Sequence, residues 1–336
     1  MIKKIGRRTL GFEETPSIVG YGSVAGKKES EGPLSQHFDK LIYDSYDGND
    51  TYEQAESRLQ NEAVSVALAK AKLSADEVDC IFAGDLLNQC ISSSFGLKEF
   101  GIPYLGQYGA CSTMAQGLIM SAIFVESGAA DIAACVTSSH FASAERQYRF
   151  PLEYGGVRTP TAQWTVTGAG SCVLKNVKKG ASVARATIGK IVDLGVTDVN
   201  NMGAAMAPAA AQTLKSYFED TSTSPDDYDL ILTGDLGEVG SKALYSLLEQ
   251  DNINIQKNHN DCGLMIFERT KQDVHAGGSG CGCSASVLCS KILNDFKNHR
   301  LENILFMATG ALMSPTSCSQ GENIPGIAHL VNIKNR

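Results

Sequence analysis

The sequence predicts an α/β protein built as a five-layer α/β/α/β/α sandwich from two halves with the same internal order. A segment occurs twice: residues 74–86 read SADEVDCIFAGDL and residues 224–236 read SPDDYDLILTGDL. Each half also carries a Cys-Ser pair at the start of a helix-like run, at Cys111 and at Cys283. The expected strands are mostly continuous apolar runs, which indicates sheets covered by helices on both faces. Two such sheets, with helices between and outside them, give the five layers.

The first half is expected to alternate strands and helices. The run at 17–25 is short, apolar and glycine-rich, as in a buried strand with close backbone contacts. Ala55, Leu59 and Ala63 recur at helical spacing within residues 51–72. The remaining expected elements are an exposed excursion at 35–50, strands at 78–83, 104–108 and 131–137, helices at 92–100 and 112–126, a long irregular segment at 138–163, and strands at 164–175 and 182–192.

The second half is expected to repeat that order. Its first helix should begin near Pro208, because proline suits the first turn of a helix, and should end near Glu219. The later expected elements are strands at 229–233, 262–268, 303–308 and 326–333, a helix at 241–250, and a helix that follows Cys283 and ends near residue 296. We divide the chain into two halves, residues 1–195 with Cys111 and residues 196–336.

Composition narrows the classes of partner. The 336 residues are 43% hydrophobic and 20% charged, as in a globular protein, and the net charge of -8 argues against binding to nucleic acid or to a bare anionic membrane. The basic N-terminus is not followed by the apolar core of a signal peptide. The longest apolar stretch, residues 114–125, is too short to span a bilayer. We therefore expect neither a signal peptide nor a transmembrane helix.

The ten cysteines indicate a reducing compartment and not a disulfide scaffold. Cys80, Cys135 and Cys172 lie inside apolar strand-like runs, where a free thiol behaves as a small hydrophobic side chain. Cys281 and Cys283 have no matching Cys/His pair at the spacing of a zinc site. We expect no metal and no cofactor.

The duplicated order and the position of Cys111 resemble the thiolase fold, which includes condensing enzymes such as ketoacyl synthases. The runs AERQYRFPLEYGGVRTPTAQWTVTGAG, at 144–170, and HAGGSGCGCSA, at 275–285, resemble the stage V sporulation protein AD family of spore-forming bacteria. That resemblance implies a protein that binds dipicolinic acid, alone or as its calcium chelate, and that serves the machinery loading calcium dipicolinate into the developing spore. It also implies a homodimer, other membrane subunits of the stage V sporulation channel as partners, and a peripheral place on the cytoplasmic face of the inner membrane of the forespore or spore.

Cys111 is the first candidate for chemistry. At a helix N-terminus the free N–H groups and the helix dipole favour an anion, so the pKa of this thiol is expected to be lowered. The same amides can form an oxyanion hole or hold a carboxylate. The alternative is an inert buried cysteine, and the turn alone does not decide between the two.

The sequence around the expected pocket departs from that of condensing enzymes, which pair the cysteine with two histidines or with a histidine and an asparagine. After the strand at 229–233, where one histidine motif is expected, the chain reads Gly-Asp-Leu-Gly and carries Asp235. Aligned without gaps, GSGCGCSAS places Ser279 at the other histidine, and His275 falls four residues too early. Acyl transfer needs these groups within hydrogen-bond reach, so we expect it to be lost, with Cys111 and His275 as vestigial catalytic candidates.

The segment at 138–163 is long for a compact fold and combines arginines with aromatic residues, so it is expected to be functional. Dipicolinate is a flat ring with two carboxylates; arginine pairs with carboxylates, and aromatic side chains stack on rings. The alternative, which is compatible with this role, is a dimer-contact or pocket-capping loop. The predicted ligand-binding residues are Cys111, Arg146, Arg149, Arg158, Trp164, Asp85, Asp235, His140 and Ser279.

Three members of that set are weaker candidates. Asp85 and Asp235 follow equivalent strands and are favoured as helix caps or turn formers, although both lie at strand ends where α/β sheets place ligands. His140 ends the strand at 131–137, on the side where the pocket is expected to open. The leading hypothesis is a binding protein that is not an enzyme. The alternatives are a condensing-type acyltransferase with Cys111 as nucleophile and an assembly subunit with a purely structural role.

Overall fold

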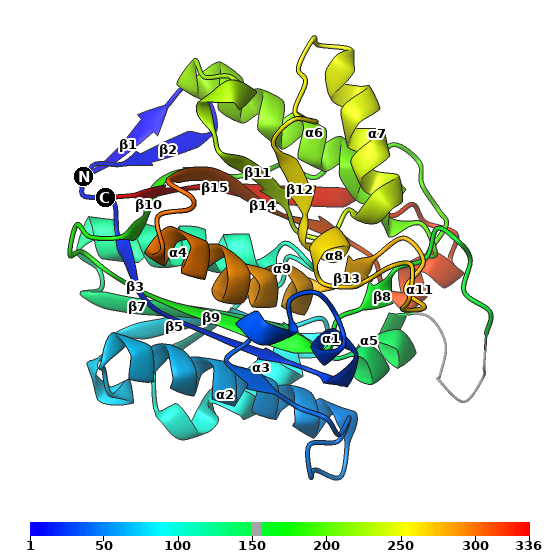
Figure 1. Cartoon of the computed structure of the whole chain (residues 1–336), viewed down its shortest axis with the longest axis horizontal. Coiled ribbons are helices and arrows are strands. Elements are labelled where there is room, and N and C mark those ends of the chain that lie inside the picture. Colours follow the sequence, from blue (N-terminus) through cyan, green and yellow to red (C-terminus); the bar gives the residue numbers. More distant parts are fainter. Residues whose placement is uncertain (149–155) are drawn as a thin grey trace.

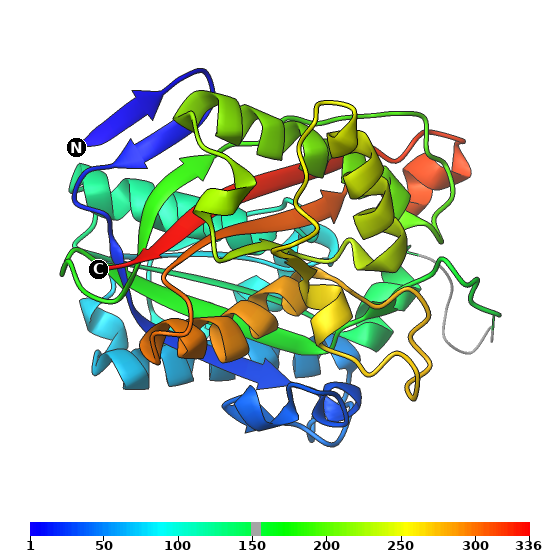
Figure 2. The same cartoon turned by 45° about the horizontal axis from the view of Figure 1, so that its top comes forward.

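The structure, a computed structural model, describes residues 1–148 and 156–336, and its elements form five layers (Figure 1). The outer helices are α2 (Tyr52–Ala71) and α3 (Ile91–Leu97) on one side, and α6 (Met202–Thr221) and α7 (Gly237–Glu249) on the other. Between the two sheets lie α4 (Thr113–Ser127) and α9 (Cys281–Val287), and the turned view in Figure 2 shows the same layers. The five-layer sandwich predicted from the sequence is confirmed.

Two mixed sheets are joined at one edge. The strands are β1 (Ile2–Ile5), β2 (Thr9–Phe12), β3 (Ser17–Ala25), β4 (Lys40–Leu41), β5 (Cys80–Gly84), β6 (Tyr104–Gly106), β7 (Ile132–Ser139), β8 (Trp164–Thr165), β9 (Gly168–Lys175), β10 (Ala181–Thr187), β11 (Leu230–Thr233), β12 (His259–Asp261), β13 (Gly278–Ser279), β14 (Asn303–Ala311) and β15 (Gly326–Asn335). The first sheet has the order β3-β9-β7-β5-β6 and the second β12-β11-β14-β15-β10. A single antiparallel pair, Ser17 with Ser182, connects them. Because β10 pairs within the second sheet, the first half of the chain contributes to both sheets; the division at residue 195 stays a prediction.

The duplicated segments make the same contacts in both halves. Ser74 and Ser224 each form a capping box on a short 3-10 turn. The Asp79 carboxylate accepts two backbone N–H groups at the start of β7, at 2.7 and 2.9 Å. The Asp229 carboxylate accepts two at the start of β14, at 2.7 and 2.8 Å. These side chains fix the entry of one parallel strand beside another, so the repeat is structural and not only a sequence pattern.

The layers are closed by buried apolar surface. Every residue of β5 and β7 is buried, as continuous apolar runs require when helices cover both faces of a sheet. The ten cysteines are all free, and nine of them are buried. In residues 1–148 and 156–336, no helix has the length and apolarity needed to cross a membrane, and no group of side chains has the arrangement of a metal site.

Several predicted elements differ from the structure. The remaining helices are α1 (Lys27–Ser30), α5 (Phe141–Tyr148), α8 (Cys262–Met265), α10 (Leu293–Lys297) and α11 (Pro315–Ser319). The predicted strand at 262–268 was wrong, because α8 begins there after the short strand β12, and a brief apolar run does not distinguish strand from helix. The predicted irregular segment at 138–163 contains α5, and the predicted strand at 164–175 is divided into β8 and β9.

Two helix starts also lie elsewhere than predicted. Asn201 caps α6 by accepting the Ala204 N–H, so Pro208 lies inside the helix and not in its first turn. Helix α9 begins at Cys281, directly after Gly280 with φ of 103°, and Cys283 is therefore already inside it. The side-chain cap and the glycine conformation thus set the two boundaries.

Candidate functional site

Cys111 lies on a tight turn between β6 and α4. The turn is held by its own side chains: the Ser112 hydroxyl donates to the Gly109 carbonyl at 2.6 Å. Gly310 of β14 packs against it, and a Cβ at Gly310 would lie 2.6 Å from the Gly109 carbonyl oxygen and 3.2 Å from the Cys111 nitrogen. The second sheet therefore comes close enough to cover the cysteine, whose exposed fraction is 5%.

Asp235 is the charged group that meets Cys111. Its carboxyl group is fully buried, bonds the Cys111 thiol, and accepts hydrogen bonds from the Gly280 N–H at 2.9 Å and the Thr309 hydroxyl at 2.8 Å. The Ser279 hydroxyl lies 3.4 Å from the same carboxyl group. Burial raises the pKa of Asp235 to about 7 against these hydrogen bonds. The group that replaces the expected histidine is thus a carboxyl group in direct contact with the sulfur.

The predicted lowering of the pKa of Cys111 was wrong. Burial, followed by the nearby charge of Asp235, raises the pKa of this thiol well above its ordinary value. The helix dipole is equivalent to only a fraction of a positive charge at the helix N-terminus. Complete desolvation and an adjacent carboxylate both destabilise a thiolate, and together they outweigh the dipole. Cys111 is therefore a protonated thiol at neutral pH.

A small cavity of about 20 Å³ adjoins the Cys111 thiol, which is room for about one water molecule. Its described walls are mainly apolar and include Leu86, Ala144, Tyr148, Thr165, Ser279 and Met313. The Tyr148 hydroxyl bonds the half-exposed Tyr108 hydroxyl at 3.1 Å and closes one side. The described lining contains Ser279 but no histidine and no arginine.

The other predicted catalytic candidate, His275, does not reach this cavity. Its side chain has an exposed fraction of 27%, and its Nε2 lies 2.9 Å from the Asp273 carboxylate. His275 pairs with Gln163 across an isolated β-bridge on the approach to β13. The four-residue offset between His275 and Ser279 in the sequence therefore separates their side chains in the structure. Ser279 lines the cavity, and His275 lies outside its described walls.

Asp85 and Asp235 occupy equivalent positions but have different environments. Asp85 accepts the Leu87 N–H, the Ser93 N–H and the Ser93 hydroxyl, at 2.9, 2.8 and 2.6 Å, and so forms the turn after β5. In the second half the comparable role falls to Asp261, which accepts the Leu236 and Gly237 N–H groups. Asp235 is thereby free to face Cys111. The prediction of paired turn formers is confirmed for Asp85, and Asp261 was missed because it lies in the strand β12, far from the repeat.

Two of the remaining predicted ligand residues border a second and larger cavity. This cavity of about 340 Å³, here called the Trp164 cleft, lies between the turn from β3 to α1, the loop before α2, and the turn from β7 to α5. His140 and Trp164 line it. Trp164 and Thr165 are neighbours in β8, where successive side chains point to opposite sides, so Trp164 faces the cleft while Thr165 faces the Cys111 cavity.

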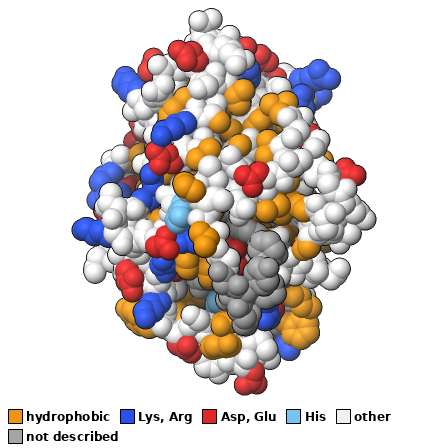
Figure 3. Space-filling model, turned by 90° about the vertical axis from the view of Figure 1, so that its right-hand side faces the viewer, with side chains coloured by type: hydrophobic (Ala, Val, Ile, Leu, Met, Phe, Trp, Pro, Cys, Tyr) orange, Lys and Arg blue, Asp and Glu red, His pale blue; other side chains and the backbone are white. Residues whose placement is uncertain are grey.

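Two of the three predicted arginines pair with carboxylates of the chain itself. Arg146 bonds Glu53 and lies over the Tyr52 ring, and Arg158 pairs with Asp273 at 2.7 Å and lies over the Trp164 ring. His140 donates from its Nε2 to the Ser45 carbonyl at 2.8 Å, since its Nδ1 accepts the Ala142 N–H. Arg149 lies outside the described residues. Figure 3 shows the face toward which β8 and α5 run, where acidic, basic and hydrophobic side chains are interspersed.

Comparison with known proteins places the chain in a family. The family model of stage V sporulation protein AD (SpoVAD) matches residues 6–334. The chain belongs to the stage V sporulation protein AD family. The stage V sporulation protein AD of Bacillus subtilis (strain 168) is 44% identical over 328 residues, which cover 98% of this chain and 97% of that protein.

Solved structures show the same fold at low sequence identity. The cerulenin-bound OleA of Xanthomonas campestris has a TM-score of 0.61 at 14% identity, with 96% of this chain and 99% of that chain covered. The 3-oxoacyl-[acyl-carrier-protein] synthase III from Aquifex aeolicus VF5 has a TM-score of 0.56 at 12% identity, with 95% and 99% covered. The tetronic acid condensing enzyme AbyA1 gives 0.60 at 16% identity, with 95% and 100% covered. The fold is thus thiolase-like, as the sequence predicted.

Proposed function

We propose that this chain is a dipicolinic acid-binding protein of the machinery that takes calcium dipicolinate into the spore, and that it does not transfer acyl groups. Membership in a sporulation family supports the first part. The contact between Asp235 and Cys111 carries the second part. In this proposal the cavity of a condensing-enzyme fold serves binding and not catalysis.

The chemistry at Cys111 favours that proposal. A condensing nucleophile must become a thiolate and needs a nearby group that accepts its proton or donates to the substrate oxygen. A buried carboxylate beside Cys111 would oppose the thiolate by like charge, and both groups are already desolvated. His275, the nearest histidine in sequence to Ser279, bonds Asp273 instead.

The walls of the Cys111 cavity suit a flat ring with polar substituents. Leu86, Met313 and Tyr148 supply apolar and aromatic contact surface, and the Ser279 hydroxyl, which makes a contact of 3.4 Å to Asp235, is a donor for a carboxylate oxygen. Since about 20 Å³ is open, dipicolinate must displace a wall side chain to enter. Tyr148 is the side chain we assign to that movement, because among the described residues its hydroxyl bonds only the Tyr108 hydroxyl.

Calorimetry with the full chain tests this proposal. Dipicolinate is expected to bind, and Ser279→Ala is expected to weaken binding by roughly tenfold or more, as for a lost hydrogen bond to a charged group. Ser286→Ala is the matched control, because Ser286 is a buried serine of α9 whose hydroxyl bonds the Cys283 carbonyl. Absence of binding at millimolar dipicolinate, or equal affinity in Ser279→Ala and the native chain, would contradict the proposal.

The competing function, a condensing-type acyltransferase, makes a different prediction. It requires a covalent acyl adduct on Cys111 after incubation with an acyl-CoA, detected by mass spectrometry of the intact protein and of the Cys111 peptide. We expect no adduct. An adduct that is absent from Cys111→Ala would replace the binding proposal with the enzymatic one. A purely structural subunit would neither bind dipicolinate nor form the adduct.

We also propose a homodimer that associates peripherally with the inner spore membrane, on its cytoplasmic face, through other subunits of the stage V sporulation channel. The family resemblance supports the partners and the location. The edge strand β6 supports the dimer: in the described residues it pairs with β5 alone, and Tyr104 and Leu105 are exposed there. Exposed apolar residues on an unpaired strand edge are suited to pairing with a second chain.

A further inference from the structure

The Trp164 cleft is the larger of the two cavities that hold predicted ligand residues, and neither acyl transfer nor the Cys111 cavity explains it. Its inner wall is apolar and comes from Ile42, Leu59, Phe141 and Trp164. Phe141 stacks on Trp164, with ring centroids 3.8 Å apart, so this part of the wall is rigid. A volume of about 340 Å³ is within the range of small-molecule sites.

Glu29 places an unpartnered carboxyl oxygen in this cleft. The residue is 1% exposed, and its Oε1 accepts the Thr167 N–H at 3.1 Å. In the described part of the chain its Oε2 has no hydrogen-bond partner, although it is buried. Such a group costs free energy unless a partner arrives, so the free Oε2 points to a ligand that carries a hydrogen-bond donor.

The charges around Glu29 favour a cationic donor. Carboxylates outnumber cations in the lining, with Glu29, Glu31, Asp44 and Asp47 against Lys27 and Lys28. The Lys28 ammonium lies 3.9 Å from the centroid of the Trp164 ring. Because Asp47 pairs with Arg58 and Arg158 also lies over the Trp164 ring, the charges of the lining nearly cancel, and the attraction for a cation comes from Glu29 and Asp44. Burial raises the pKa of Glu29 to about 7, and a cation beside this carboxyl group would hold it ionised.

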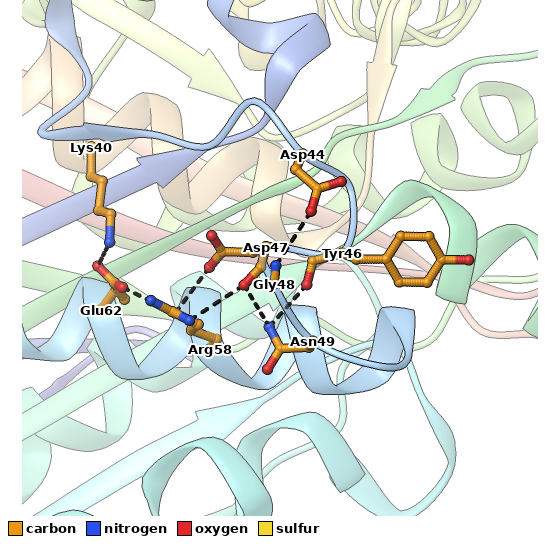
Figure 4. Close-up of polar contacts among 8 residues, drawn as sticks. All are labelled: Lys40, Asp44, Tyr46, Asp47, Gly48, Asn49, Arg58 and Glu62. Atoms are coloured by element: carbon orange, nitrogen blue, oxygen red, sulfur yellow. Dashed lines mark hydrogen bonds and ion pairs between the residues drawn. The ribbon is translucent and has the colours of Figure 1, made fainter.

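The loop on the outer side of the cleft is fixed by its own contacts, as Figure 4 shows. Asp47 pairs with Arg58 of α2 at 3.0 Å, and the Asn49 side-chain amide donates to the Tyr46 carbonyl at 2.9 Å. Asp44 accepts only the Gly48 N–H, at 3.3 Å, among the contacts drawn. Asp47 is thus neutralised by an arginine, and Asp44 keeps its charge at the rim.

We propose that the Trp164 cleft is a second small-molecule site, separate from the Cys111 cavity, and that it binds an organic ammonium compound with a compact apolar body. The ammonium group donates to Glu29 Oε2, and the apolar body packs against Phe141, Trp164 and Leu59. Asp44 contributes attraction at the rim. Binding involves no covalent step.

Intrinsic fluorescence of the full chain is a direct readout, because Trp164 is the only tryptophan in the sequence. Three probes of similar size separate charge from shape: benzylamine, benzyl alcohol and phenylacetate. Benzylamine is expected to change the Trp164 emission saturably and to bind about tenfold or more tightly than benzyl alcohol, as for a hydrogen bond to a charged group. Phenylacetate is expected to bind more weakly still.

Two variants locate the effect at Glu29. Glu29→Gln keeps the size of the side chain and removes its charge, and it is expected to abolish the preference for benzylamine over benzyl alcohol. Gly26→Ala keeps the charge, but the added Cβ would lie 2.9 Å from Glu29 Oε2 and is expected to weaken benzylamine binding. Glu31→Gln is the matched control at the exposed rim, with an expected change of less than about threefold.

The outcomes are decisive in both directions. Saturable benzylamine binding that is lost in Glu29→Gln and kept in Glu31→Gln supports the site. Three outcomes would overturn the proposal. They are equal affinity for all three probes, tighter binding of phenylacetate, and no binding of benzylamine up to about 10 mM, the weakest affinity expected for a ligand of its size. A response to Ca²⁺ without a response to benzylamine would also overturn it, in favour of a metal site. Dipicolinate calorimetry on the same variants keeps this result separate from the proposed function.

Discussion

Asp235 of the second half holds its carboxyl group against the thiol of Cys111 in the first half. The contact is possible because Asp261 takes over the turn-forming role that Asp85 has in the first half. The two aspartates at equivalent positions of the repeat therefore have different roles: Asp85 forms a turn, and Asp235 faces the cysteine. Burial and, after it, this contact raise the pKa of the Cys111 thiol, so both keep the sulfur protonated.

Replacing Asp235 tests that relationship. In Asp235→Asn the adjacent negative charge is gone, so the pKa of the Cys111 thiol is expected to fall toward its ordinary value while burial still keeps it raised. Alkylation of Cys111 by iodoacetamide at about pH 8 should be several-fold faster than in the native chain, as measured by peptide mass spectrometry. Cys318, which is partly exposed, is the internal reference in both proteins. Rapid alkylation of Cys111 in the native chain would contradict a raised pKa.

Buried carboxyl groups predict how stability depends on pH. Burial raises the pKa of Asp235 to about 7 and that of Glu56 to about 8, both above the values of the unfolded chain. At pH values between the unfolded and folded pKa values, the native state binds more protons than the unfolded chain. The stability that these two groups contribute should therefore be greatest below about pH 4. It should decrease as the pH rises to about 8. Glu56→Gln should flatten this fall, by at most about 1.4 kcal/mol per pH unit.

Urea denaturation at a series of pH values measures this dependence. Glu62→Gln is the control, because Glu62 is a partly exposed glutamate of the same helix, α2. A native chain whose stability rises steadily from about pH 4 to about pH 8 would show that these carboxyl groups are ionised in the folded state.

The layers of the fold could be predicted because they depend on local patterns. A repeated segment with Asp79 and Asp229 at equivalent positions and continuous apolar strands define two similar sheets, and the structure shows both. Ser279 was also placed at the cavity from a motif alone. Such features can be predicted because the residues of each motif lie within a few positions of one another in the sequence.

The electrostatics of the site could not be predicted in the same way. The pKa of Cys111 depends on how closely Gly310 and Asp235 pack over it, and both come from the other half of the chain. Arg146 and Arg158 were predicted to meet a ligand at this pocket, but their carboxylate partners, Glu53 and Asp273, lie far away in sequence. Burial and ion pairing are tertiary properties, and a motif or helix position does not determine them.

The edge strand β6 makes the proposed dimer testable. Leu105 is 45% exposed on this edge, and Leu105→Lys is expected to shift the chain from dimer to monomer, because lysine on a strand edge opposes pairing. Sedimentation velocity at micromolar concentration measures the change. Leu194→Lys is the matched control, since Leu194 is 66% exposed in a segment outside the strands. A native chain that sediments as a monomer would contradict the proposed dimer. A dimer that Leu105→Lys leaves unaffected would place the interface on another surface.

The repeat itself predicts equal effects in the two halves. Asp79→Ala and Asp229→Ala each remove two hydrogen bonds from a carboxylate to backbone N–H groups, at the start of β7 and of β14. Each change is expected to lower the free energy of unfolding by roughly 2 kcal/mol, with the two values within about 1 kcal/mol of each other. Asp76→Ala is the control, because Asp76 is an exposed aspartate of the same repeat, as Asp79 is, but among the described residues its carboxylate accepts no backbone N–H group. A large loss in one half and none in the other, measured by urea denaturation, would show that only one copy still depends on the shared contact.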